Sequence, residues 1–128
     1  NTMFKVGTAY PVNNLALRIG SHMTRYPDEY LSYIEQVHRS KELYIPKLNK
    51  LGCNVIFSYT NFINIQLPHS ISAHGVLNKL KEKKTLVRGS YNHPALINSI
   101  RVTVPDICRM ELFYNRFKEI IHESSANI

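Results

Sequence analysis

The apolar residues of this 128-residue chain change their spacing at Gly52, and that change limits what the chain can fold into. Before Gly52 they recur at steps of three and four residues, which is typical of helices that bury one side. After Gly52, two short runs of β-branched and aromatic residues, Val55–Phe57 and Phe62–Ile65, are typical of strands. The chain is therefore expected to combine helices with a sheet.

Two helices are expected in the first part of the chain. The sequence predicts a short helix over residues 15–23 and a long helix that begins at Pro27 and ends at Gly52. Proline suits the first position of a helix, and glycine is a common residue just after its end. Pro46 lacks an amide hydrogen and its ring crowds the preceding turn, so we expect a kink or a break near Leu43.

The second half of the chain predicts two more strands and two more helices. The strands are expected at Thr85–Arg88 and Ser99–Val104, and one helix over residues 70–83. The last helix follows Asp106, whose carboxylate can accept a hydrogen bond from a free amide of the first turn. Its apolar face comprises Ile107, Met110, Phe113, Tyr114, Phe117, Ile120 and Ile121. This order of elements predicts an α+β fold, with helices packed on a small, mainly antiparallel four-stranded sheet.

Each of the last two predicted strands contains an arginine, Arg88 and Arg101. Side chains alternate between the faces of a strand. In the last strand the residues expected to face the core are Ile100, Val102 and Val104, and those expected on the other face are Ser99, Arg101 and Thr103. A guanidinium can bind a carboxylate or a phosphate through two parallel hydrogen bonds. Arg101 is therefore a candidate anion ligand, with a solvated surface arginine as the alternative.

The chain is basic, with 16 Lys and Arg against 9 Asp and Glu, a net charge of +7. Such an excess raises nucleic acid as a partner. The densest basic segment, residues 79–84, lies at the end of a predicted helix, where cations complement the helix dipole. The aromatic and glycine-rich signature of sheet-based RNA-binding domains is missing. Nucleic acid is therefore an unlikely partner, and an autonomous basic α+β module for RNA or another anion is the alternative function.

Other side chains predict little chemistry. Cys53 and Cys108 are too few for a disulfide framework, and we interpret both as reduced packing residues. The histidines are scattered, and no zinc spacing is found among His22, His38, His69, His74, His93 and His122. His93 is expected to be a turn residue, although it could line a substrate opening. Three tyrosines at helical spacing are expected in the core or at a domain interface, namely Tyr30, Tyr33 and Tyr44.

The length of the chain fits one domain with a single core. No apolar run approaches the roughly 20 residues of a membrane span, and the N-terminus lacks a signal-peptide pattern. A soluble, cytoplasmic protein is therefore expected. The chain begins at Asn1 and not at a methionine, so we expect it to be a piece of a longer protein.

Three short segments, in this order of elements, carry a resemblance to a known family. They are Ser58–Phe62 (Ser-Tyr-Thr-Asn-Phe), Leu86–Arg88 and Ile100–Val104, which precedes the closing helix. Together they resemble the C-terminal small domain of histidinol-phosphate aminotransferases, and more broadly the class I and II, fold-type I enzymes that use pyridoxal phosphate. The resemblance implies that residues 1–26 lead out of a large domain and that residues 27–128 form the small domain.

The resemblance also implies roles for single residues. Arg101 matches the arginine that holds the α-carboxylate of the amino-acid substrate, and Arg88 matches the one near the distal phosphate. Asn61 matches an asparagine whose side chain is expected to fix the turn between two strands. Pro105 and Asp106 stand where the family has a glycine, which alters the start of the last helix and leaves the substrate open.

No segment of this sequence matches the Ser-Lys-x-x-x-x-x-Gly-x-Arg pattern that carries the Schiff-base lysine of the family. The resemblance places that lysine, and the groups that hold pyridoxal phosphate, in the large domain. The chain is therefore expected to bind substrate for a longer, homodimeric aminotransferase of amino-acid biosynthesis, to hold no cofactor and no metal, and to be inactive alone. The substrate stays open between histidinol phosphate, an aromatic amino acid and the phosphorylated threonine of a related decarboxylase.

Overall fold

The computed structural model describes residues 12–89 and 92–126, so Tyr91 and the first 11 residues of the expected linker lie outside the described residues. The chain divides into two compact units between Tyr33 and Ile34. The first unit contains helix α1 (Asn14–Met23) and the start of helix α2 (Pro27–Lys50). In α1 the Asn13 side chain accepts a hydrogen bond of 2.8 Å from the Ala16 amide, and no residue of this helix is buried.

Helix α2 continues through Pro46, so the expected break near Leu43 is wrong. A proline removes one hydrogen bond, to the carbonyl four residues earlier, which here belongs to Glu42. Both Pro46 and Glu42 lie on the exposed side of the helix, where water can satisfy that carbonyl. The opposite side of this part of α2 is apolar and buries Tyr44 and Leu48, and this packing holds the helix together.

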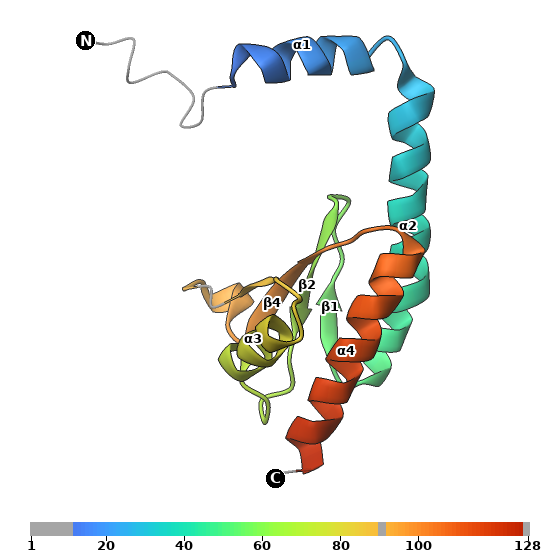
Figure 1. Ribbon diagram of the computed structural model, residues 1–128. Helices are drawn as coiled ribbons and strands as arrows, with labels where there is room; N and C mark the ends of the chain where they lie inside the picture. Colours follow the sequence, from blue (N-terminus) through green and yellow to red (C-terminus); the bar gives the residue numbers. More distant parts are fainter. Residues whose placement is uncertain (1–11, 90–91, 127–128) are drawn as a thin grey trace, which may run out of the picture. The chain divides into compact units, whose positions relative to one another are not determined.

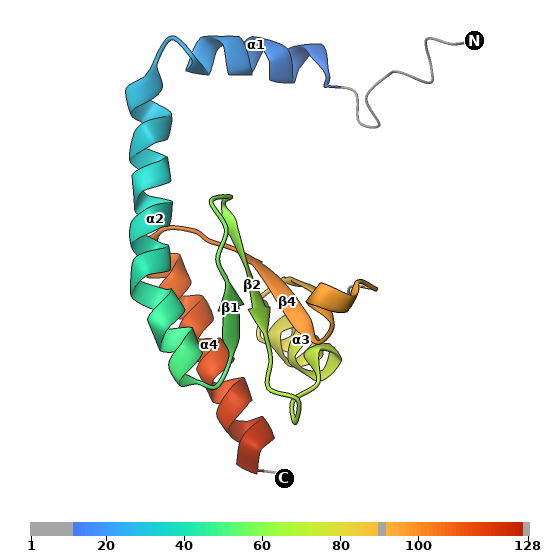
Figure 2. The ribbon, with the colours of Figure 1, turned by 180° about the vertical axis from the view of Figure 1, so that it is seen from behind.

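The second unit is built on a four-stranded antiparallel sheet with the strand order β1-β2-β4-β3. Its strands are β1 (Asn54–Ile56), β2 (Phe62–Gln66), β3 (Arg88–Gly89) and β4 (Ser99–Thr103). Figures 1 and 2 show helices α3 (Ala73–Glu82) and α4 (Ile107–Ala126) on one face of this sheet. The expected order of helices and strands and the expected α+β class are confirmed.

The core lies between the sheet and the helices. Residues of β2 and β4 that alternate along the strands point into it, and the buried ones are Ile63, Ile65, Ile100 and Val102. Helix α4 contributes Met110, Phe113, Phe117, Ile120 and Ile121, as its apolar pattern predicts. Ile107 is an exception, because it lies in the first turn of α4 and is 40% exposed.

One detail of the predicted strands is wrong. Strand β3 begins at Arg88 and not at Thr85, because the amide of Thr85 still donates to the Leu80 carbonyl at the end of α3. Ser99 lies on the face opposite the core, as expected, but it is buried there. A short 3₁₀ turn (Pro94–Leu96) covers it, and the Ser99 hydroxyl donates to the Leu96 carbonyl at 2.6 Å.

Polar contacts fix the ends of the two helices that cover the sheet. Asp106 caps α4 as predicted, since its Oδ1 accepts a 3.0 Å hydrogen bond from the Arg109 amide. Two lysines of the basic segment 79–84 bind carboxylates of α4, in the pairs Lys79–Glu123 and Lys83–Glu119. These pairs attach the end of α3 to α4, so part of the basic segment has a structural role.

Asn98 connects the start of α3 to the segment that follows β2. Its side chain donates to the carbonyls of Pro68 and Ile71, at 3.2 and 2.9 Å, and accepts from the Ala73 amide at 2.8 Å. The backbone of Asn98 is left-handed, with φ of 54°, a conformation that asparagine tolerates better than most residues. No pattern in the sequence indicated this role of Asn98.

Candidate functional site

The sheet has a second face that the helices α3 and α4 do not cover, and Figure 2 shows it toward the viewer. The strand register places one residue from each strand in a single row across this face: Ile56, Asn64, Arg101 and Arg88. Arg101 pairs directly with Asn64 on one side and with Arg88 on the other. The two predicted anion ligands are therefore immediate cross-strand neighbours.

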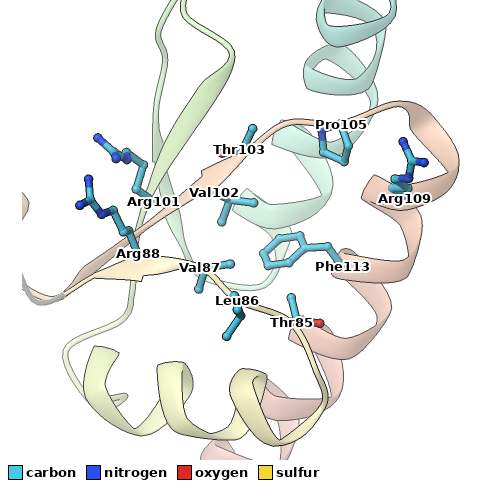
Figure 3. Close-up of a pocket in the computed structure, with 10 residues that line it drawn as sticks. All are labelled: Thr85, Leu86, Val87, Arg88, Arg101, Val102, Thr103, Pro105, Arg109 and Phe113. Carbon is cyan, nitrogen blue, oxygen red and sulfur yellow. The ribbon is translucent and has the colours of Figure 1, made fainter.

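The two arginines also point in the same direction. Figure 3 shows the side chains of Arg88 and Arg101 side by side, extending away from Phe113. Val87, which directly precedes β3, and Val102, which follows Arg101 on β4, point toward Phe113 and the core. The alternation of side chains that the sequence predicts for Arg101 and Val102 is therefore confirmed.

Arg101 is half-buried, and its guanidinium carbon lies 4.9 Å from the centre of the Phe62 ring. A guanidinium over an aromatic face gains electrostatic attraction and loses freedom. Arg88 is exposed. Within the described residues, neither guanidinium forms an ion pair with a carboxylate. Two like charges in directly opposite positions destabilise a sheet, and an anion bound between them would relieve that repulsion.

A shallow cavity of about 410 Å³ lies beside the row. It is lined by Thr85, Leu86, Val87, Arg88, Arg101, Val102, Thr103, Pro105, Arg109 and Phe113. Arg109 is committed elsewhere, because it pairs with Asp106 at 2.9 Å. The positive charges in the lining that have no carboxylate partner in the described chain are therefore Arg88 and Arg101.

Asn64 is a polar member of the row that the sequence analysis missed. Its side-chain oxygen Oδ1 is buried and has no hydrogen-bond partner within the described residues. The neighbouring residues on β2, Ile63 and Ile65, are fully buried on the opposite face. An asparagine in the middle of an apolar strand was the available sequence signal.

Lys41 holds the tip of the β1–β2 hairpin. It is buried, and its ammonium donates to the Ser58 carbonyl at 2.5 Å and to the Thr60 carbonyl. Burial lowers the pKa of Lys41, because the charged form is desolvated. The hydroxyls of Ser58 and Thr60 also bond to each other, at 2.6 Å. No pattern in the sequence indicated this role of Lys41.

The expected role of the Asn61 side chain is wrong. No hydrogen bond of that side chain is found within the described residues, and only its backbone carbonyl is used, by the Val104 amide at 2.8 Å. The turn is fixed by Lys41 and by the hydroxyls of Ser58 and Thr60, whose Oγ atoms accept from amides of the turn.

The other candidate residues fall outside the site. His93 is a turn residue, as expected, because its Nδ1 accepts a 3.2 Å hydrogen bond from the Ala95 amide. Cys53 is a buried packing residue, and burial raises the pKa of its thiol to about 11. Cys108 is exposed, so its interpretation as a packing residue is wrong. Tyr44 is in the core, whereas Tyr33 is 49% exposed.

Neither a metal centre nor a membrane-spanning helix is found within the described residues. No three of their His, Cys, Asp or Glu side chains are placed so that they could hold a metal ion together. None of the helices in the described part of the chain combines the length and the apolar character that crossing a membrane requires.

The sequence is similar to those of known enzymes. No family model matches the chain. A histidinol-phosphate aminotransferase of Crocosphaera subtropica is 30% identical over 122 residues, which are 95% of this chain and 34% of that protein. The chain thus spans about one third of the length of this curated relative.

Solved structures share the fold. A decarboxylase from Sulfurospirillum multivorans matches with a TM-score of 0.68 and 21% identity, over 94% of this chain and 35% of that one. The histidinol-phosphate aminotransferase from Clostridium acetobutylicum matches with a TM-score of 0.65 and 23% identity, over 78% of this chain and 30% of that one. The chain is similar in sequence to histidinol-phosphate aminotransferases and shares its fold with these solved structures, which fits a C-terminal fragment of a pyridoxal-phosphate-dependent enzyme of fold type I.

Proposed function

We propose that this chain is the substrate-binding part of an aminotransferase similar to the histidinol-phosphate enzymes. Arg101 binds the carboxylate of the amino-acid substrate, and Arg88 binds a second anionic group such as a phosphate. The observation that carries the proposal is the placement of both guanidiniums side by side on the uncovered face of the sheet, without an acidic partner in the described chain.

The geometry suits a small substrate. Arg88 and Arg101 are opposite each other on neighbouring strands, so their anchoring points are about 5 Å apart. Two anionic groups of one small molecule, or one anion shared by both side chains, fit this separation. The Phe62 ring restricts Arg101, so part of the ordering that binding requires is already present before the ligand arrives.

Pyridoxal phosphate, when bound in such an enzyme, supplies an electron sink for the substrate. The cavity beside the arginines does not fit that group, because its lining includes no lysine to bind it and no carboxylate for its pyridine nitrogen. Lys41, the buried lysine, is occupied by the carbonyls of Ser58 and Thr60. We therefore propose that the rest of a longer parent holds the cofactor, and that this chain alone is inactive.

Helix α1 supports the proposal of a longer parent. None of its residues is buried, although it carries large apolar side chains that are 44–67% exposed, namely Leu15, Leu17, Ile19 and Met23. Exposed apolar residues in such number indicate a surface that a partner covers. We propose that residues 1–26 connect to a large domain, which covers α1, and that residues 27–128 form the small domain. Only the family resemblance supports a homodimeric, cytoplasmic parent.

The decisive experiment is Arg101→Lys in the full-length parent. Lysine keeps the charge but loses the two-pronged geometry, so the KM for the amino-acid substrate should rise about tenfold or more, whereas the cofactor absorbance should stay unchanged. Arg109→Lys is a matched control, since Arg109 lines the same cavity but pairs with Asp106. An unchanged KM in Arg101→Lys contradicts the proposal.

The gene upstream of the Asn1 codon provides an independent test. We expect it to encode roughly 200 further residues, the size of another domain, including a candidate Schiff-base lysine. If this reading frame instead starts just before Asn1, the RNA-binding alternative gains weight. Salt-dependent binding of the chain to single-stranded RNA would then support that alternative, and no binding at low salt would remove it.

A further inference from the structure

We propose that Asn64 is a positioning residue for Arg101, and that its side-chain oxygen accepts a hydrogen bond from the guanidinium when an anion is bound. This inference rests on the proposed function of Arg101. It adds a residue that neither the family resemblance nor the charge pattern identifies.

The first observation is the register. Asn64 on β2 and Arg101 on β4 are direct cross-strand partners, and both lie on the uncovered face. The Cβ atoms of such partners are about 5 Å apart, so an asparagine amide lies within reach of the long arginine side chain. No other strand lies between them, because β2 and β4 are adjacent in the sheet.

The second observation is the unsatisfied oxygen of Asn64. Its Oδ1 is buried and unpartnered within the described residues. Leaving a buried acceptor without a donor destabilises the folded state, and a leucine in the same place would not carry this cost. A second, ligand-bound state in which Oδ1 accepts a hydrogen bond would explain why an asparagine occupies this position.

The third observation concerns the side chain of Arg101, the cross-strand partner of Asn64. Arg101 now rests over the ring of Phe62, 4.9 Å from its centre. Phe62 and Asn64 are two residues apart on the same face of β2, with Asn64 directly opposite Arg101 and Phe62 opposite Thr103. A rotation of the Arg101 side chain along β2 would therefore bring its guanidinium from Phe62 toward Asn64. A guanidinium has five N–H donors, and a carboxylate or phosphate bound through two of them leaves three for other acceptors.

The proposal gives the Arg101 side chain two positions, of which the structure shows the first. Without an anion, the charge of Arg101 is stabilised by the Phe62 ring. With an anion bound, two N–H donors of the guanidinium bind the ligand and a third donates to Asn64. This third hydrogen bond fixes the orientation of the guanidinium plane. Anion binding then also satisfies the buried oxygen, so the two events strengthen each other.

The test is the binding of inorganic phosphate to the 128-residue chain, followed through the Nε–Hε NMR signal of Arg101. The loss of one signal in Arg101→Lys identifies that resonance. In Asn64→Leu we expect the dissociation constant for phosphate to rise about tenfold, as expected for one lost hydrogen bond to a charged group. The matched control is Gln66→Leu, which alters the same face of the same strand at a residue already bonded to Asn54.

Thermal unfolding of the same variants separates positioning from a structural role. Asn64→Leu removes an unsatisfied acceptor, so its melting temperature should stay the same or rise while its affinity for phosphate falls. A structural role predicts that both fall together, and that result would overturn the inference. The inference is also overturned if Asn64→Leu binds phosphate as tightly as the unsubstituted 128-residue chain.

Arg101→Lys distinguishes the failure of this inference from the failure of the proposed function. Suppose that the unsubstituted 128-residue chain binds phosphate, that Arg101→Lys loses this binding and that Asn64→Leu keeps it. Then only the role of Asn64 is wrong. If the unsubstituted 128-residue chain binds no phosphate, or Arg101→Lys binds it equally well, Arg101 is not an anion ligand, and both its role in the proposed function and the inference about Asn64 are wrong.

Discussion

The two faces of the sheet differ in how completely their side chains are satisfied. The face under α3 and α4 is apolar, and its residues Ile63, Ile65, Ile100 and Val102 are no more than 4% exposed. The uncovered face carries Asn64, Arg88 and Arg101, among which are a buried acceptor without a donor and two cations without a carboxylate in the described chain. Both faces are built from the same few strands.

We infer from this difference that one face of the sheet stabilises the fold and that the opposite face is available to bind a ligand. Side chains on the covered face stabilise the fold through burial, and they tolerate change poorly because the core is close-packed. Side chains on the uncovered face keep unused bonding capacity, which contributes little to folding but is available to a ligand. Substitutions of neighbouring residues on the same strand should therefore have very different consequences.

The largest effect is expected from Ile65→Ala on the covered face. Ile65 is fully buried, so the substitution removes packed methyl groups and leaves a cavity. The free energy of unfolding, measured by urea denaturation, should fall by about 2–5 kcal/mol. Thr103→Val on the exposed face of β4 is the control and should change it by less than about 0.5 kcal/mol. Equal effects of the two substitutions would remove the distinction between the faces.

A smaller loss of unfolding free energy is expected when the hydrogen bonds of the Asn98 side chain are removed. Asn98→Ala leaves the carbonyls of Pro68 and Ile71 and the amide of Ala73 without their partner. We expect a loss of about 1–3 kcal/mol in the same denaturation experiment. Asn54→Ala, which removes an exposed 3.2 Å contact with Gln66, should have little effect. A stable Asn98→Ala would mean that water replaces these bonds.

Gly89 tests how closely α3 approaches the sheet. A Cβ atom at Gly89 would lie 2.8 Å from Cδ1 of Leu77 and 3.1 Å from the Ser99 carbonyl oxygen. Gly89→Ala should therefore lower the melting temperature, at a cost of about 1 kcal/mol. Gly75→Ala is the contrasting control, because its Cβ would meet only Ser72 at 4.0 Å and alanine favours a helix. The two substitutions should shift the melting temperature in opposite directions.

The smallest effect concerns the start of α4 and depends on pH. The hydrogen bond from the Arg109 amide holds the pKa of Asp106 below its ordinary value of 3.8. The folded state therefore favours the ionised carboxylate, so its contribution is complete above that value and is lost as the pH falls through the lowered pKa. Asp106→Asn keeps an acceptor but cannot titrate. The melting temperatures of the two chains should differ at neutral pH and converge in acid, and a constant difference would contradict this.

The periodicity of the sequence was sufficient to predict the order of the elements and the class of the fold. It also predicted which face of β4 carries Arg101, and the Asp106 cap, because these depend on neighbours close in sequence. The expected start of a strand at Thr85 was wrong because Lys84 is left-handed and the amide of Thr85 still donates to the Leu80 carbonyl of α3. Burial of the other side of α2 outweighs the hydrogen bond lost at Pro46.

The site itself could be predicted only in part. The arginines were visible as charges within apolar strands, and the resemblance to a family suggested what they bind. The positions of Asn64 and Phe62 beside Arg101 depend on the pairing of β2 with β4, whose residues are far apart in the chain. The role of Lys41 could not be predicted for the same reason, since its hydrogen-bond partners are 17 and 19 residues away in the chain.

The sequence by itself determined which segments are helices and strands and which side of each is apolar, because those properties follow from local periods of about 3.6 and 2 residues. Only the tertiary structure decided which strands are neighbours, and hence that Arg88, Arg101 and Asn64 share one row of the sheet. Strand order depends on burying the apolar sides of all elements together. That requirement belongs to the whole domain, and no single segment of the sequence expresses it.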